Sequence, residues 1–145
     1  MRVAVGADHA GYELKELLKA RLAAAGHEVA DLGAFSTDST DYPDWAAKVA
    51  ASVAEKRAER GLLVCGTGTG MAIAANRRPG ARAVATSDLF SVELARRHND
   101  VNILALGARI VAPALAEALL EKFLATPFEG GRHERRVRKL DGEAT

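Results

Sequence analysis

A cysteine followed by alternating glycines is the part of this sequence whose residue types and spacing best suit chemistry. Residues 62–65 form a short apolar run that ends at Cys65, which is typical of a buried parallel strand. Small apolar residues after the glycines predict a helix. Backbone N–H groups converge where a strand breaks into a helix, so the loop predicts a site for a phosphate or a reaction oxyanion. The loop residues are Gly66, Thr67, Gly68, Thr69 and Gly70.

Cys65 stands at the start of this loop. Nearby amides and the helix N-terminus would favour its thiolate, the reactive form of a thiol. The alternative is a small buried cysteine that merely ends a strand, and for the strand alone this is the commoner case. The loop beside it favours the functional interpretation.

A second group of polar residues follows the first predicted strand, residues 3–6. Asp8 and His9 come directly after it, where side chains are exposed at the carboxyl edge of a parallel sheet. The alternative is an aspartate that caps a helix beside a solvated histidine. Tyr42, next to Pro43, either borders the same pocket or packs on a helix end.

Arginines near the end of the chain suit a phosphate. Arg132 and Arg136 are four residues apart, so on a helix they project from one face and can clamp a phosphate. A solvated basic tail is the alternative. Arg109, after Gly107, is either a further phosphate ligand or an exposed loop residue.

His98 and Asn99 precede the predicted strand 101–106, at the edge of the sheet opposite to the glycine loop. A histidine in this position is usually a surface residue or a helix C-terminal cation. Within one chain His98 would lie too far from the pocket to act there, but the His98 of a partner subunit could reach it. We interpret His27 and His133 as structural or surface residues, and no pattern of histidines and carboxylates indicates a metal site.

The composition excludes several classes of function. A formal net charge of +1 over 145 residues gives no support to binding of nucleic acid or membranes. The single cysteine excludes an internal disulfide and a cysteine-based zinc site, so a reducing, cytoplasmic setting fits. The apolar run at the N-terminus is too short for a signal peptide, and no apolar stretch is long enough to span a membrane.

Strand and helix alternate five times, which predicts a three-layer αβα sandwich. Its centre would be a five-stranded parallel Rossmann-like sheet in a single domain, residues 1–145. With the usual start of the strand order, 2-1-3, the ligand crevice lies between strands one and three, which brings Asp8 and Cys65 together. The predicted strands are 3–6, 27–32 (at an edge), 62–65, 81–86 and 101–106, and the predicted helices include 43–60, 114–125 and a short basic helix near the end.

Five motifs together resemble a known family over almost the whole chain. They are GADHAGYELK, TDYPD, CGTGTGMAIAANRRPGARA, ARRHNDVNILALGAR and FEGGRHERRV. They are similar to those of the ribose-5-phosphate isomerase B family, which also includes allose- and galactose-6-phosphate isomerases. The resemblance implies an aldose–ketose isomerase of the non-oxidative pentose phosphate pathway, without metal or cofactor. It also implies a homodimer, often paired into a tetramer, with pockets between subunits.

The resemblance assigns roles by match of motif. Cys65 corresponds to the base that carries a proton between C2 and C1 of the open sugar, and one branch of the family instead uses a glutamate where Met71 stands here. Thr67 and His98, the latter from the partner chain, correspond to the groups that open the furanose ring. The amides of Gly66–Gly70 correspond to the hole for the enediolate oxygen. The sugar-hydroxyl contacts would be Asp8 and Asn99, and the phosphate ligands His9, Arg132 and Arg136, with Arg109 added from the partner.

Two alternative functions stay open. The first is the same chemistry on a six-carbon phosphosugar, which depends on the depth of the pocket. The second is a non-catalytic sensor of a phosphosugar or nucleotide that uses the same loop. A sensor has no use for Cys65 in particular, so replacing this residue separates it from an isomerase.

Overall fold

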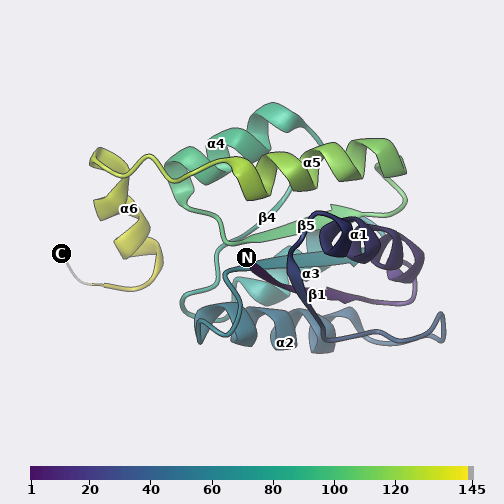
Figure 1. Ribbon diagram of the computed structural model, residues 1–145. Helices are drawn as coiled ribbons and strands as arrows, with labels where there is room; N and C mark the ends of the chain where they lie inside the picture. The colour runs from purple at the N-terminus through teal and green to yellow at the C-terminus, as the bar shows by residue number, and fades with distance from the viewer. Residues whose placement is uncertain (144–145) are drawn as a thin grey trace.

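The apolar runs of the sequence form one five-stranded sheet in the order β2-β1-β3-β5-β4, and each pairing of neighbours is parallel. The computed structural model describes residues 1–143 (Figure 1). The order begins 2-1-3 and places β2 at an edge, as predicted. The strands are β1 (Arg2–Ala7), β2 (Glu28–Asp31), β3 (Arg60–Cys65), β4 (Ala83–Ala85) and β5 (Ile103–Gly107).

Helices cover both faces of the sheet, which confirms the predicted three layers (Figure 1). Leu62 and Val64 of β3 pack into the core shared with α1, α4 and α5, whereas Leu63 and Cys65 pack against α2 and α3. Because side chains alternate along a strand, the last residue of β3 turns its sulfur toward α2 and α3. The helices are α1 (Tyr12–Ala24), α2 (Tyr42–Ala54), α3 (Thr69–Ala75), α4 (Leu89–Asn99), α5 (Pro113–Ala125) and α6 (Arg132–Leu140).

The prediction of a helix over 43–60 was wrong at its end. The helix stops at Ala54 because Lys56 has a φ of 59°, in the left-handed region that ends helices. The prediction of a strand over 101–106 began too early, since the N–H of Val101 donates to the carbonyl of Ala95 at the end of α4.

The predicted strand 81–86 is also shorter in the structure, where β4 spans Ala83–Ala85. The side chain of Asn102 accepts from the N–H of Arg82 at 2.8 Å, and the side chain of Asn76 accepts from the N–H of Ala83 at 2.7 Å. Side-chain amides therefore pair with the backbone N–H groups where this edge strand begins.

A buried charge fixes the loop that follows β2. Lys15 of α1 has no exposed surface, and its Nζ donates to Asp31 Oδ1 at 2.9 Å and to the carbonyl of Ala34. Lys19 donates to the other carboxylate oxygen of Asp31 at 2.8 Å. The loop that leaves β2 toward the carboxyl edge of the sheet is thus tied to α1 by hydrogen-bonded ion pairs.

Candidate active site

The loop between β3 and α3 is packed so closely that glycine is required in and around it. Gly68 has a φ of +83°, and a Cβ there would lie 3.1 Å from the carbonyl oxygen of Ala105 on β5. A Cβ on Gly107 would lie 2.7 Å from the Cα of Thr67. The end of β5 therefore sets the path of the loop, and a methyl group at either glycine would displace it.

This path directs a backbone amide at the thiol. The N–H of Gly68 donates to Cys65 Sγ at 3.2 Å, and Cys65 is 5 % exposed, at the carboxyl end of β3. An N–H donor favours negative charge on sulfur. Thr67 and Thr69 are exposed on the outer side of the loop, whereas Gly68 between them is buried against β5.

The loop after β1 lies directly against the end of β3, as the strand order predicted. The N–H of Asp8 donates to the carbonyl of Val64 at 3.2 Å, and the carboxylate of Asp8 accepts from the N–H of Gly11 at 3.0 Å. A Cβ on Gly11 would lie 2.2 Å from the Val64 oxygen, so only glycine permits this approach. The buried Asp8 is held beside the residue that precedes Cys65.

Tyr42 and Arg109 border the glycine loop, and His9 lies against the loop before α2. His9 Nδ1 accepts from the N–H of Thr40 at 3.2 Å, which ties it to the loop before α2. The ring of Tyr42 lies over Gly70, where a Cβ would stand 2.3 Å from a ring carbon. Arg109 Nη1 is 3.3 Å from the position of a Cβ on Gly66 of the same chain, so its guanidinium borders the loop of its own chain.

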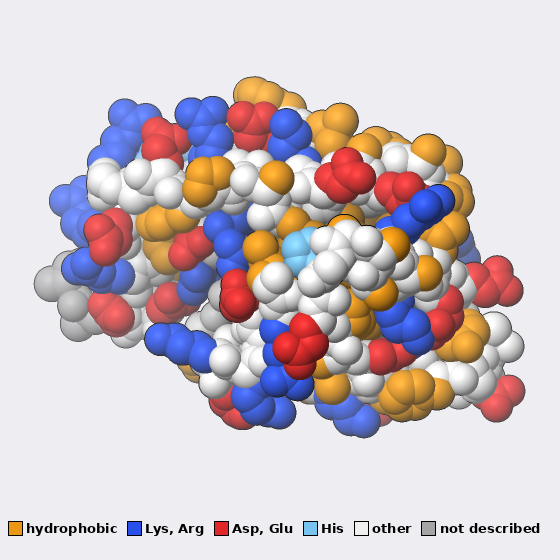
Figure 2. All heavy atoms as spheres, viewed as in Figure 1, with side chains coloured by type: hydrophobic (Ala, Val, Ile, Leu, Met, Phe, Trp, Pro, Cys, Tyr) orange, Lys and Arg blue, Asp and Glu red, His pale blue; other side chains and the backbone are white. Residues whose placement is uncertain are grey.

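The remaining predicted residues lie at the other end of the sheet. His98 and Asn99 end α4, just before β5 begins, and Arg132 and Arg136 are exposed on α6. Figure 1 shows α6 at the left of the molecule, and Figure 2 shows Lys and Arg side chains gathered at that end. The chain therefore presents two separate groups of candidate residues, as the sequence position of His98 indicated.

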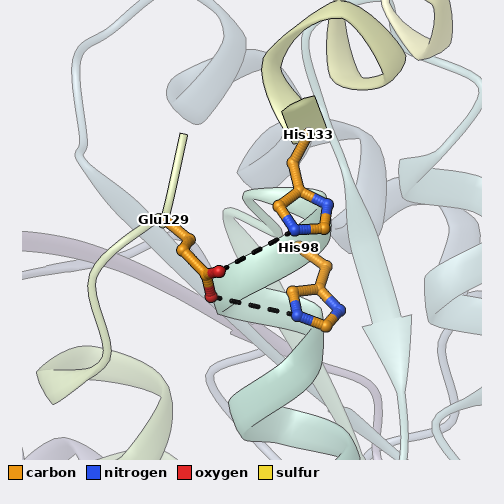
Figure 3. A group of neighbouring side chains, drawn as sticks. All are labelled: His98, Glu129 and His133. Carbon is orange, nitrogen blue, oxygen red and sulfur yellow. Dashed lines mark ion pairs between the residues drawn. The ribbon is translucent and has the colours of Figure 1, made fainter. Parts of the chain in front are cut away.

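At this second end, a side-chain cluster was missed from the sequence. The rings of His98 and His133 stack with centroids 4.3 Å apart and planes 10° apart, and Glu129 faces both rings (Figure 3). His133 is buried, which agrees with the prediction that it is a structural residue. Glu129 was not singled out from the sequence. The four-residue spacing of Glu129 and His133 was the available signal, and the intervening Gly130–Gly131 hid it because two glycines do not suggest a helix face.

Fold and site together define a class of protein. A doubly wound parallel sheet with a tight glycine loop at its carboxyl edge, between β1 and β3, is an α/β domain of the class whose ligands bind in the crevice at the switch point. A model of the family described as Ribose/Galactose Isomerase matches residues 3–140. The chain belongs to this family, which confirms the resemblance seen in the motifs.

Known isomerases are similar to this chain in sequence and structure over nearly its full length. The chain is 45% identical to ribose-5-phosphate isomerase B of Escherichia coli over 139 residues, 96% of this chain and 93% of that one. A crystal structure of a ribose 5-phosphate isomerase from Thermotoga maritima superposes with a TM-score of 0.95 at 48% identity, covering 98% of each chain. Ribose-5-phosphate isomerase B of Clostridium thermocellum gives 0.96 at 43% identity, covering 98% and 96%.

Proposed function

We propose that this chain is an aldose–ketose isomerase that interconverts ribose 5-phosphate and ribulose 5-phosphate, with Cys65 as the base. The observation that carries the proposal is the 3.2 Å hydrogen bond from the Gly68 N–H to Cys65 Sγ, beside the buried Asp8. Relatives that share more than two fifths of the sequence bear the name of this activity.

The chemistry needs one base and a set of fixed donors. The thiolate of Cys65 takes the proton from C2 of the open aldose, and the electron pair moves into an enediolate. The thiol then delivers a proton, partly exchanged with solvent, to C1, while the hydroxyl proton on O2 passes to O1, which gives the ketose. A positioned base contributes about 10²–10⁴ in rate. A backbone donor to the enediolate oxygen contributes about 2.7–4 kcal/mol, and amides of Gly66–Gly70 would serve this role.

The substrate and the base are tested together by one assay. Isomerisation of ribose 5-phosphate and allose 6-phosphate is measured side by side, for the unmodified protein and for Cys65→Ala and Cys65→Ser. We expect a preference for the five-carbon substrate and loss of turnover in Cys65→Ala, while calorimetry still detects binding of ribitol 5-phosphate, which has no carbonyl. Preference for allose 6-phosphate would favour the six-carbon alternative. Cys65→Ala with no change in function would favour the sensor.

A second part of the proposal concerns self-association. His98, Asn99, Arg132 and Arg136 lie at the amino edge of the strands, whereas Cys65 lies at the carboxyl edge. A homodimer that apposes unlike ends would complete each site with the phosphate ligands and the ring-opening histidine of the other copy. We therefore expect a dimer, with pairing into a tetramer as a further step, in the reducing cytoplasm where a lone thiol base stays active.

Mixing two inactive variants tests the shared site. Cys65→Ala and His98→Asn are unfolded together and refolded, so that about half of the dimers contain one copy of each. If the pocket is shared, each mixed dimer has one intact site, and about a quarter of the unmodified activity returns. If all groups act within one chain, the mixture stays as inactive as its components. Sedimentation or light scattering establishes the assembly in parallel.

A further inference from the structure

The cluster at the junction of α4 and α6 combines three groups that bind transition metals. His98 comes from the last turn of α4, His133 from the first turn of α6, and Glu129 from the segment between α5 and α6 (Figure 3). One ligand atom from each lies within 4.8 Å of the other two. Both Nε2 atoms point toward the carboxylate, at 3.9 Å from His98 and 4.0 Å from His133. Two imidazoles and a carboxylate are ligands that Zn²⁺ accepts.

An independent observation points to a ligand at this place. His133 is 5 % exposed, and its Nε2 has no hydrogen-bond partner among the described residues. A buried polar nitrogen without a partner is costly, and native structures usually satisfy such atoms. The distance from this nitrogen to Glu129 is too long for a hydrogen bond. An ion between the three groups would give both His133 Nε2 and the Glu129 carboxylate oxygen that faces it a partner.

The charges around the cluster affect how tightly it can hold a cation. Glu129 keeps one oxygen on Arg97, whose Nε donates to Oε2 at 3.0 Å, while Oε1 faces His133. Arg97, Arg132 and Arg136 face the same region and oppose a cation, so the site is expected to bind less tightly than a structural zinc site.

From this arrangement we propose that His98, Glu129 and His133 bind a zinc-class divalent ion, and that the bound ion inhibits the enzyme by occupying His98. The binding half rests on the geometry above. The inhibitory half rests on the proposed function, in which His98 opens the sugar ring in a partner's pocket.

The stacked rings must open for the ion to bind. A tetrahedral ion with bonds of about 2.0–2.1 Å needs its ligand atoms closer together than 3.9–4.8 Å, and it lies in the plane of each imidazole. Parallel rings do not direct their lone pairs to one point. The side chain of His98 is 34 % exposed, beside a hollow of about 350 Å³, so it can turn toward Glu129. This rearrangement and the nearby arginines both lower the expected affinity below that of a structural zinc site.

Calorimetry with Zn²⁺ tests the binding half directly, with Co²⁺ absorption as a second readout. We expect one ion per chain, and affinity reduced about tenfold or more in Glu129→Gln and in His133→Gln. Glu129 is partly exposed, so its variant keeps the fold even if the buried histidine variant does not. Two matched controls remove the other candidate ligands: His27→Gln and Cys65→Ala should leave binding unchanged. Absence of binding, equal binding in Glu129→Gln, or loss of binding in Cys65→Ala would overturn the site.

Activity with and without Zn²⁺ tests the inhibitory half. Each protein is compared with itself, so altered basal rates do not matter. We expect inhibition that substrate opposes and a chelator reverses, at about tenfold higher ion concentration in Glu129→Gln than in the unmodified protein. Binding without inhibition, or inhibition unchanged in Glu129→Gln, would overturn it. If the ion-free protein had no isomerase activity, the proposed function would fail, while calorimetry would still report on the ion site.

Discussion

The two ends of the sheet carry candidate residues in different ways. At the carboxyl edge, the loop around Cys65 is made of backbone held between β1, β3 and β5, and glycines permit approaches that no side chain would allow. At the amino edge, His98, Arg132 and Arg136 are side chains on helix surfaces, and the two arginines are exposed in the single chain.

This difference separates what one chain can do from what two chains can do. Backbone donors fixed by a sheet are preorganised, so they suit an oxyanion that forms during the reaction. Arginines on a surface helix suit a phosphate that arrives with the substrate, because long side chains can close around it. We expect the carboxyl edge to supply proton transfer and the amino edge to supply ring opening and phosphate binding.

The largest expected effect is in an experiment that separates proton transfer by Cys65 from ring opening by His98. Ribulose 5-phosphate is an open chain, so exchange of its C1 hydrogen with solvent needs the base but no ring opening. Cys65→Ala should lose this exchange by about 10²–10⁴, whereas His98→Asn should keep it while losing turnover of cyclic ribose 5-phosphate. Proton NMR in D₂O measures the exchange. Undiminished exchange in Cys65→Ala would end the assignment of the base.

The next effect tests how firmly the carboxyl edge is held. In Asp31→Asn the fully buried Lys15 loses its carboxylate partner at 2.9 Å and keeps only the longer pair with Glu16 at 3.4 Å. Removing one member of a buried pair costs about 3 kcal/mol in the free energy of unfolding. Urea titration at neutral pH measures the loss. Glu28→Gln is the matched control, because it breaks the exposed pair with Arg2 and should cost less than about 1 kcal/mol. Equal losses in the two variants would contradict the importance of the buried pair.

The same carboxylate gives a pH dependence of defined sign. Burial raises the pKa of Asp31, but hydrogen bonds from Lys19, Lys15 and the Gly33 N–H lower it by more, so its pKa in the folded protein lies below the usual 3.8. Its contribution to stability is therefore complete above about pH 3.8 and is lost as the pH falls through the folded-state pKa. The stability difference between the unmodified protein and Asp31→Asn should shrink over that range.

The sequence revealed the carboxyl edge well because its information is local. Alternating glycines after a buried strand predict a backbone loop, and Asp8 directly after the first strand predicts its neighbour once the strand order begins 2-1-3. The end of α2 was missed because a lysine in the left-handed region, Lys56, has no sequence signal as a glycine would.

The amino edge was harder to predict because its contacts join distant segments. His133 stacks on His98 across 35 positions of sequence, and nothing local to either residue indicates the pairing. One contact at the carboxyl edge is equally non-local, since the buried Lys15 of α1 depends on Asp31 at the end of β2. Helix periodicity did predict that Arg132 and Arg136 lie on one face of a helix. It did not predict which residues that face contacts.

A third prediction tests whether activity depends on the close contact between the glycine loop and the ring of Tyr42. Gly70→Ala places a methyl group where the Tyr42 ring now lies, 2.3 Å from a ring carbon, so loop or ring must move. A displacement of about 1 Å near reacting atoms costs about 10² in kcat/KM. Tyr42→Ala added to Gly70→Ala removes the obstruction and should recover part of the loss. Failure of the double variant to recover any activity would mean that Gly70 acts through its own backbone freedom rather than through Tyr42.

The smallest effect concerns the phosphate ligands of the amino edge. Arg136→Ala removes one charged hydrogen-bond donor, so KM should rise about tenfold to a hundredfold with kcat less affected. Arg135→Ala is the matched control, since it removes the same charge from the same helix without the four-residue spacing to Arg132. If the two variants raise KM equally, and the effect disappears in high salt, α6 attracts the substrate through its general charge and does not clamp the phosphate. A rise confined to Arg136→Ala that persists in salt would assign α6 a direct contact, which the position of Cys65 at the opposite edge allows only across a subunit boundary.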